Sequence, residues 1–321
     1  MIKLVVSGKE NGQTLEKYVR KVLSEAPLSF IYKLFRKKDI KVNGHWEKEK
    51  FIINENDEVS IYITDEQLDE FKKKVKEVTS SNISNWIIYE DKNILIINKP
   101  RGVIVQKDDT GDVALDEMVI SYLINKGEYD PSKDLGYTPA PSHRLDRNTA
   151  GLIVFGKNIE TLRYLSKIMS DKNLIEKKYL TLVVGNIEKE GEIVAPLEKN
   201  SKSGKVYVSE SGKVAITRYK PIKNLDGFTL VEVQLLTGRT HQIRVHFAYI
   251  NHPVVGDSKY GDFNLNKEIE NKYHFKNQFL VSYSLRFNKL EEPLKYLNNK
   301  SFRIDLPKEL EELLYKLGVN N

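Results

Sequence analysis

The spacing of apolar residues predicts several short elements in the first part of the chain. Apolar side chains over 15–23 recur three and four positions apart, which is the spacing of one helix face. The same spacing predicts a second helix over 29–37, with Ser29 as its N-cap. Asn43–Gly44 lies between two extended runs and predicts a hairpin turn, and the alternation over 59–63 predicts a half-buried strand.

These elements predict a small separate domain over residues 1–63. Residues 64–84 are rich in charged side chains and end in Thr, Ser and Asn, so we expect a linker there with a helical first half. Residues 85–321 then form one large domain.

The large domain mixes strand and helix patterns without regular alternation. Apolar and alternating runs predict strands at 86–89, 94–98, 178–184, 228–236 and 280–287. Helical spacing predicts helices at 159–169, 240–250 and 307–317, the second of them capped by Thr240. The irregular order argues against a doubly wound parallel sheet. The sequence therefore predicts an α+β domain with a mixed, mostly antiparallel sheet.

Composition narrows the class of protein. The chain has 321 residues, 40% of them hydrophobic, and a formal net charge of +6. This modest excess of positive charge favours a polyanionic partner, although a basic protein without nucleic acid contact has the same composition. Cysteine is absent, which excludes disulfides and thiolate zinc sites and favours a reducing compartment. With no apolar run long enough for a signal peptide or a membrane span, we expect a cytoplasmic protein that does not enter a membrane.

A cluster of basic residues lies at the end of the second predicted helix and in the turn after it. Its members are Lys33, Arg36, Lys37, Lys38 and Lys41. Such a cluster can contact phosphates, and it can equally be a solvated helix face.

The segment "SHRLDRNTAGLIVFGK", residues 142–157, holds a single acid in a basic loop before a buried strand. Asp146 lies between Arg144 and Arg147, and neighbouring guanidinium groups favour its ionised form. From these residues alone Asp146 is a nucleophile, a general base or one half of an ion pair.

Two further segments carry candidate site residues. In "LLTGRTHQIRVHF", Arg239 follows a glycine at a strand–helix junction, where it could pair with a carboxylate in a cleft. His241 and His246 are five positions apart and lack a metal-ligand spacing, so we expect hydrogen-bonding supports or RNA contacts and no metal site. In "EKKYLTLVVG", Tyr179 lies in a strand and by itself indicates no catalytic role.

Taken together and in order, these motifs resemble the RluA family of RNA pseudouridine synthases. The motifs are "NKPRG", "HRLDRNTAGL", "KKYLTLVVG", "TGRTHQIRVH" and "PVVGDSKYG", and they extend over nearly all of residues 85–321. The first segment resembles the α-L RNA-binding motif, and "PLSFIYKLFRKKDIKVNG" is similar to the RluC branch, which acts on large-subunit ribosomal RNA. Asn148 and Ala150 replace the aspartate and serine that are common in the family.

The resemblance implies a role for individual residues. Asp146 corresponds to the catalytic aspartate, and Arg239 to the arginine that pairs with it. Tyr179 corresponds to the tyrosine that packs against uracil and helps to remove the proton from carbon 5. Arg144 corresponds to the residue that fills the space of a flipped uridine, and Arg147 is expected to contact a phosphate or the protein itself.

The same resemblance implies an isomerisation that requires no cofactor. His241 and Arg244 are also expected to contact substrate. The expected partner is ribosomal RNA, with transfer RNA as a second possibility, and the protein is expected to act as a monomer. Two alternatives remain open from the residues: a catalytically silent RNA-binding chaperone, and a carboxylate glycoside hydrolase, which ordinarily needs a second acid beside the bond.

Overall fold

Amphipathic spacing in the first sixty residues produces two helices over one small core. Helix α1, Leu15–Val22, and helix α2, Leu28–Lys37, each bury the side that carries their regularly spaced apolar residues. Thr14 caps α1 by accepting a hydrogen bond from the Lys17 amide at 3.4 Å. The cap of α2 is Pro27 and not Ser29, because Pro27 takes the extended backbone angles of an N-cap and the helix has already begun at Leu28.

We describe these features in a computed structural model, which covers residues 1–6, 10–71, 83–108, 110–131, 137–201 and 203–318. Apart from those gaps, the chain divides into two compact units. One contains residues 1–82 together with 117–139 and 158–160; the other contains 83–116, 140–157 and 161–321. The predicted domain bounds, 1–63 for the small domain and 85–321 for the large one, remain predictions.

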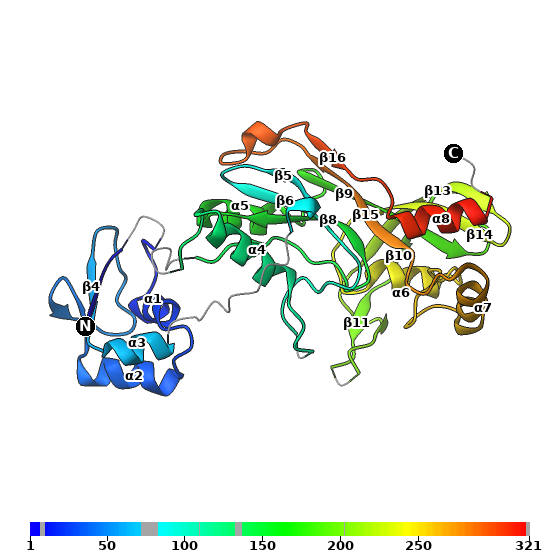
Figure 1. The fold of residues 1–321 in the computed structure, drawn as a ribbon. Helices are drawn as coiled ribbons and strands as arrows, with labels where there is room; N and C mark the ends of the chain where they lie inside the picture. The colour runs from blue at the N-terminus through cyan, green and yellow to red at the C-terminus, as the bar shows by residue number, and fades with distance from the viewer. Residues whose placement is uncertain (7–9, 72–82, 109, 132–136, 202, 319–321) are drawn as a thin grey trace. The chain divides into compact units, whose positions relative to one another are not determined.

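A four-stranded antiparallel sheet lies beside α1 and α2 in the first unit (Figure 1). Its order is β1, β4, β2, β3, with bounds Ile2–Val5, Glu58–Ile61, Ile40–Val42 and His45–Trp46. The predicted hairpin turn joins β2 to β3, and Asn43 and Gly44 both have positive φ, at 52° and 82°. Helix α3, Asp65–Phe71, forms the helical first half expected for the linker; the rest of that segment, 72–82, lies outside the described residues.

The second unit is built on a ten-stranded sheet (Figure 1). Its main path runs β10, β13, β14, β9, β15, β8, β6, β5, with β16 paired to β15 and β7 to β8. In that path order the bounds are Gly191–Val194, Ile216–Leu225, Phe228–Leu235, Ile175–Val184, Leu280–Phe287, Ala150–Gly156, Ile94–Lys99 and Ile87–Glu90; β16 is Ser301–Arg303 and β7 is Ala140–Pro141. Among the described strands, β15 and β8 form the one parallel pair. The predicted mixed, mostly antiparallel α+β fold is therefore confirmed.

The other helices and a small hairpin are divided between the two units, since residues 117–139 and 158–160 belong to the first. The remaining helices are α4, Leu115–Asn125; α5, Ile159–Ile168; α6, Gln242–Tyr249; α7, Phe263–Tyr273; and α8, Lys308–Lys316, with short 3-10 turns η1, Ser84–Trp86, and η2, Lys295–Leu297. Strands β11, Leu197–Lys199, and β12, Val206–Val208, form a separate hairpin. Trp86 belongs to η1, so the first predicted strand begins one residue later than expected.

Two apolar clusters stabilise the large sheet. One joins residues of α5 to β6, β8 and the end of β15, and the other joins α7 and α8 to β9, β14 and the start of β15. Strand β15 contributes to both clusters and lies between β8 and β9, so it brings the loop before β8 next to the side chains of β9. None of the helices in the described ranges has the length and apolar character needed to cross a bilayer.

Candidate active site

The Asp146 loop joins β7 to β8 and is held from below by buried polar groups. Thr149 closes the turn by donating its amide to the Asp146 carbonyl at 3.0 Å. Fully buried Lys99, from the end of β6, donates to the Arg147 carbonyl at 3.0 Å and to two further carbonyls in its own segment. Gln278 donates to the Thr149 hydroxyl at 2.7 Å. The backbone beneath the acid is therefore fixed by residues from other parts of the chain.

Gly151 permits the close approach of β8 to β15. It pairs with Ser282 across the parallel ladder and has a φ of +118°. A Cβ at this position would lie 2.2 Å from the Ser282 carbonyl oxygen, so no larger residue fits without moving a strand. Ser282 in turn pairs with Tyr179 of β9. One glycine thus sets the spacing between the Asp146 loop and Tyr179.

Arg244, in the first half of α6, joins two carboxylates. Its Nη1 donates to Asp146 Oδ2 at 2.9 Å, while Nε and Nη2 donate to the two oxygens of Asp257 at 2.6 and 2.8 Å. Asp257 is completely buried, whereas the Asp146 side chain is 26% exposed. Charge-assisted bonds of this forked kind are strong and directional. The arrangement therefore holds a partly accessible carboxylate at the end of a buried ion pair.

Backbone amides hold Asp257 in place, so its carboxylate is a fixed partner for Arg244. It accepts hydrogen bonds from the amides of Lys259 and Tyr260, at 2.8 and 3.1 Å. These bonds and the Arg244 guanidinium keep the pKa of Asp257 below its usual range, against the effect of burial, which would raise it. Asp257 thus remains ionised and orients the arginine.

Tyr260 connects this centre to the β11–β12 hairpin. Its ring lies under the Arg244 guanidinium, 5.1 Å from Cζ to the ring centroid. Its hydroxyl accepts a hydrogen bond from the Val206 amide at 2.9 Å and contacts His241 Nδ1 at 2.8 Å. His241 Nε2 is 3.9 Å from Asp146 Oδ2. Burial lowers the pKa of His241. The charge of Asp146 opposes this shift, and the charges of Arg244 and Lys259 add to it, so the net shift favours a neutral imidazole beside the acid.

The expected pairing of Arg239 with Asp146 is wrong, and Arg244 takes that place. Arg239 precedes the helix and is exposed, with its Nε donating to the Val214 carbonyl at 3.0 Å. Helix α6 begins at Gln242, whose side chain accepts from the Arg239 amide at 3.0 Å. The expected Thr240 cap is also wrong: His241 occupies the N-cap with a positive φ, and Gln242 bonds back to the junction instead.

Tyr179 is buried in β9 on the side of the sheet that faces the acid. Burial raises its pKa to about 12, the negative charge of Asp146 adds to this rise, and a hydrogen bond with Ser282 opposes it. At neutral pH Tyr179 is therefore a protonated phenol in an enclosed position near a carboxylate.

The two arginines of the loop lie in different surroundings. Arg144 is exposed, and within the described ranges it makes no ion pair. Arg147 donates from Nη1 to Asp112 at 2.5 Å and from Nη2 to the Thr110 hydroxyl at 2.9 Å, and is also paired with Asp108. Arg147 thus binds an acidic loop of the protein, whereas Arg144 is open to an incoming ligand.

The histidines do not form a metal centre. His246 is fully buried and bonds to the Thr217 hydroxyl and the Ala195 carbonyl, both at 2.9 Å. In the part of the chain that the structure describes, no group of three histidine, aspartate or glutamate side chains could hold a metal ion. His246 therefore supports the packing of α6 on β13.

The predicted basic cluster lies in the first unit. Lys33, Arg36 and Lys37 project from exposed positions of α2, Lys38 ends this helix in the left-handed conformation, and Lys41 is in β2.

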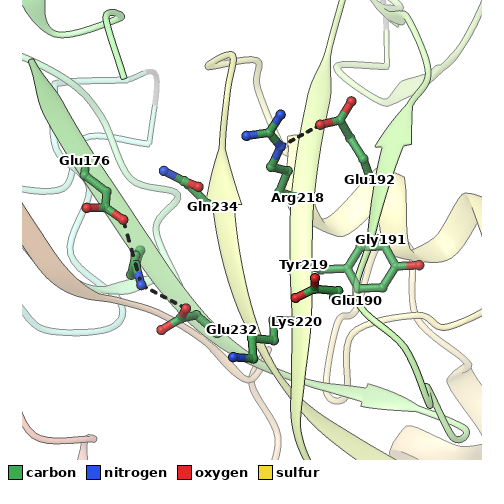
Figure 2. A pocket seen from close by; sticks show the side chains of 10 residues that line it. Glu176, Glu190, Gly191, Glu192, Arg218, Tyr219, Lys220, Glu232 and Gln234 are labelled. Carbon is green, nitrogen blue, oxygen red and sulfur yellow. Dashed lines mark hydrogen bonds and ion pairs between the residues drawn. The ribbon is translucent and has the colours of Figure 1, made fainter. Parts of the chain in front are cut away.

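A shallow pocket of about 450 Å³ lies on the face of the large sheet opposite Tyr179. Figure 2 shows the side chains that line it. Lys178 lines it, and because neighbouring residues of a strand point to opposite faces, it lies opposite Tyr179. Two ion pairs lie within its lining: Lys178 with Glu232 at 3.0 Å and Arg218 with Glu192 at 2.7 Å. This pocket is separate from the Asp146 centre, because among the described residues neither Asp146 nor any residue that contacts it lines the pocket.

Sequence reasoning missed four residues that build the centre. Lys99 lies in the motif "NKPRG", and Asp257 and Tyr260 lie in "PVVGDSKYG". Gly151 lies in "HRLDRNTAGL", five positions after Asp146. The sequence offers two signals for them. Lys99 precedes a proline at the end of an apolar run, and Asp257 follows a glycine.

Comparison with known proteins gives one consistent result. The family model described as RNA pseudouridylate synthase matches residues 93–249. An uncharacterized RNA pseudouridine synthase of Mycoplasma capricolum is 32% identical over 94% of this chain and 96% of its own. Ribosomal large subunit pseudouridine synthase C of Pasteurella multocida is 33% identical over 96% of this chain and 90% of its own. The solved human RNA pseudouridylate synthase domain containing 4 has the same fold, with a TM-score of 0.60 at 22% identity over 75% of this chain and 96% of that one.

Proposed function

This chain belongs to the RluA family of RNA pseudouridine synthases, and we propose that it converts uridines of large-subunit ribosomal RNA to pseudouridine with Asp146 as the catalytic carboxylate. The observation that carries this proposal is the Asp146–Arg244–Asp257 arrangement, in which a partly exposed acid is held in place by a buried cation. The ribosomal substrate rests on the names of relatives such as that of Pasteurella multocida.

The reaction exchanges one glycosidic bond for another. The bond between uracil nitrogen 1 and ribose carbon 1 breaks, the base turns, and carbon 5 bonds to the same ribose carbon. Asp146 either attacks ribose carbon 1 or takes the proton from ribose carbon 2; both routes need an ionised, positioned carboxylate. Arg244 fixes this position, because its other two nitrogens, Nε and Nη2, each donate to Asp257. Nothing is added or oxidised overall, so the proposal includes no cofactor.

Tyr179 is proposed to complete the isomerisation. After the new carbon–carbon bond forms, carbon 5 must lose a proton. The Tyr179 hydroxyl is protonated at neutral pH, so it takes this proton only as it passes its own to a neighbouring acceptor. The proposed acceptor is the Asp146 carboxylate, which is free again once the new bond has formed and whose charge acts on Tyr179; the proton then leaves from Asp146 to solvent. The ring meanwhile packs against uracil.

Three residues at the mouth of the site are proposed to handle the RNA. Exposed Arg144 enters the stack when the target uridine leaves it. Neutral His241, close to Asp146, contacts the flipped nucleotide. Arg147 is bound to Asp108 and Asp112, so its proposed role is to hold the loop, with a phosphate contact only where RNA displaces those acids.

Residues 1–63 are proposed to be an α-L RNA-binding domain. The exposed cations of α2 and the turn after it would contact phosphates, and residues 64–84 would join this domain to the catalytic domain over 85–321. We further propose that the protein acts as a cytoplasmic monomer, with transfer RNA as a second possible substrate.

The test is release of tritium from uridine labelled at carbon 5. Wild-type protein should release tritium from ribosomal RNA fragments, and Asp146→Asn should release none while still binding RNA. Tritium release by Asp146→Asn at more than a trace of the wild-type rate would remove Asp146 from the reaction. A wild-type protein that binds these RNAs without release would instead be a silent RNA-binding protein.

A further inference from the structure

The outer face of the small sheet in the first unit carries polar and aromatic side chains in register. Lys41 of β2 pairs with Trp46 of β3 on one side and with Ser60 of β4 on the other. Ser60 also pairs with Lys3 of β1. Directly opposed residues of an antiparallel pair share a face, and Tyr62 shares that of Ser60 because it is two positions along. These side chains therefore form one strip across the sheet.

Cations and rings alternate along this strip. The Lys38 ammonium lies 5.1 Å from the centroid of the Trp46 ring, and the Lys41 ammonium lies 5.1 Å from that of Tyr62. Trp46 is oriented by its indole N–H, which donates to the Phe35 carbonyl at 3.3 Å. We define the cation–aromatic strip as Lys3, Lys38, Lys41, Trp46 and Tyr62.

The strip is on the side of the sheet away from the core. The alternate residues of the same strands, Ile40, Val42, Val59 and Ile61, belong to the core under the helices. Trp46 and Tyr62 remain 38% and 42% exposed, so both rings are accessible to a ligand. Two acids lie next to the strip. Glu58 is paired with Lys3 at 2.7 Å. Asp39 is opposite Tyr62, whose amide donates to the Asp39 carbonyl at 2.8 Å.

We propose that the cation–aromatic strip binds an unpaired strand of RNA, in which bases displace the lysine ammonium groups from the faces of Trp46 and Tyr62 and the displaced lysines contact phosphates. Aromatic rings combined with a positively charged track are the features with which proteins hold single strands, because every base has a face that can stack. This inference rests on the proposed function, which makes RNA the substrate, and adds a second kind of contact to the phosphate contacts expected of α2.

The alternation favours an unpaired strand over other occupants. A duplex keeps its base faces stacked internally, so it would use the lysines and leave the rings without a partner. A protein partner would favour a continuous apolar surface, whereas here a lysine lies over each ring. A flexible strand offers base faces and phosphates in the same alternating order as the strip.

The chain offers a direct optical test. It has two tryptophans, Trp46 and Trp86, so Trp86→Phe leaves Trp46 as the only one. Titration of this variant with a single-stranded oligouridine of about twelve nucleotides should quench Trp46 fluorescence, and an RNA duplex of equal length should not. Absence of quenching by the single strand, or equal quenching by the duplex, would refute the strip.

Substitutions then test the other ring and the cations. In the same background, Tyr62→Leu should weaken oligouridine binding on the order of tenfold. The matched control is Tyr315→Leu on α8, where the ring is 71% exposed and outside the strip, and it should leave the affinity unchanged. Lys41→Gln should lower the salt slope of binding by roughly 0.7, and Lys308→Gln should not. The inference would be refuted if Tyr315→Leu weakened binding as much as Tyr62→Leu. It would also be refuted if Lys308→Gln lowered the salt slope as much as Lys41→Gln.

Two further outcomes separate this inference from its alternatives. A change in Trp46 fluorescence with protein concentration and without RNA would show that the strip is an interface between copies of the chain, and would overturn the inference. The titration needs no turnover, and the tritium assay does not depend on Trp46. Tritium release without quenching therefore refutes the strip alone, and quenching without tritium release refutes the proposed reaction alone.

Discussion

Arg244 holds Asp146 with one nitrogen while Asp257 holds Arg244 with both carboxylate oxygens. The catalytic candidate is thus the outer member of a three-residue chain whose inner member is fully buried. Because the buried acid cannot move without losing two backbone hydrogen bonds, the guanidinium has one well-defined orientation.

Arg244→Lys is expected to lower kcat on the order of a hundredfold, because a lysine cannot contact both acids in the forked geometry. The matched control is Arg239→Gln, which removes an exposed arginine from the same motif and should remain within about twofold of wild type. Single-turnover tritium release measures both. Loss of activity in Arg239→Gln with full activity in Arg244→Lys would show that Arg239, and not Arg244, positions Asp146.

Tyr179→Phe separates stacking from proton transfer. The ring stays, so RNA binding should persist, but the hydroxyl is lost and kcat should fall on the order of a hundredfold. Deuterium at carbon 5 should slow this variant more than it slows wild type. Wild-type turnover in Tyr179→Phe together with an inactive Tyr179→Leu would assign the residue to stacking alone.

Lys99→Met removes three hydrogen bonds from beneath the Asp146 loop. It should lower both kcat and thermal stability. Lys157→Met is the matched control, because Lys157 is also a buried lysine but bonds to Glu90 and the Asp91 carbonyl, away from the loop. That variant should lose stability and keep its kcat. Equal kcat values for the two variants would show that Lys99 supports only the fold.

The charge of Lys99 also predicts a pH dependence. Burial lowers its pKa to about 7, and the charge of Asp146 opposes this shift. The unfolded chain has a lysine pKa of about 10.4, so between these values it binds more protons than the folded chain. The free energy of unfolding of wild type should therefore rise with pH relative to Lys99→Met between about pH 7 and 10, by up to about 1.4 kcal/mol per pH unit. Urea unfolding at a series of pH values measures this difference; a constant difference would contradict it.

Gly151→Ala should disrupt the parallel pair of β8 and β15. A methyl group would meet the Ser282 carbonyl at 2.2 Å in a backbone conformation that alanine avoids, so we expect a loss of about 3 kcal/mol or more in the free energy of unfolding. Gly227→Ala is the control: its φ is also positive, at +76°, but no atom lies within 4 Å. It should cost about 1 kcal/mol. Urea unfolding of the two variants distinguishes clash from backbone strain.

Chelation tests the absence of a metal from the proposed reaction. Treatment with EDTA should leave tritium release unchanged on a short substrate whose folding needs no divalent ion. Loss of turnover that added zinc restores would contradict the mechanism.

Motifs in the sequence predicted which segments meet at the site, but not every contact between them. Asp146 could be nominated from the residues as the single acid in a basic loop, whereas Tyr179 could be nominated only through the resemblance to the RluA family. The choice between Arg239 and Arg244 could not be made, because both lie in the same motif. The difference is made by the Gln242 side chain and by buried Asp257, which lies outside that motif. Side-chain contacts of that kind depend on the packing of α6 and leave no periodic signal.

Local patterns likewise predicted most strands and helices but missed elements with weak periodicity. The run at 280–287 gave the bounds of β15 because apolar and polar residues alternate from Val281 to Phe287 and the polar Asn288 follows. Helices α4 and α7 were not predicted, the latter because its eleven residues include many polar side chains and one buried apolar residue, Ile269. The caps at Ser29 and Thr240 were wrong because a proline and a histidine one or two positions away took the N-cap geometry.

The position of β15 between β8 and β9 has a consequence for how the protein is made. A nascent chain that ends before Leu280 already contains the strands of Asp146 and Tyr179, yet each has an open edge where β15 will later insert. Open strand edges are templates for pairing with other chains. The catalytic geometry is therefore completed only late in translation, and a chain truncated before residue 280 should accumulate as aggregate and not as a slow enzyme.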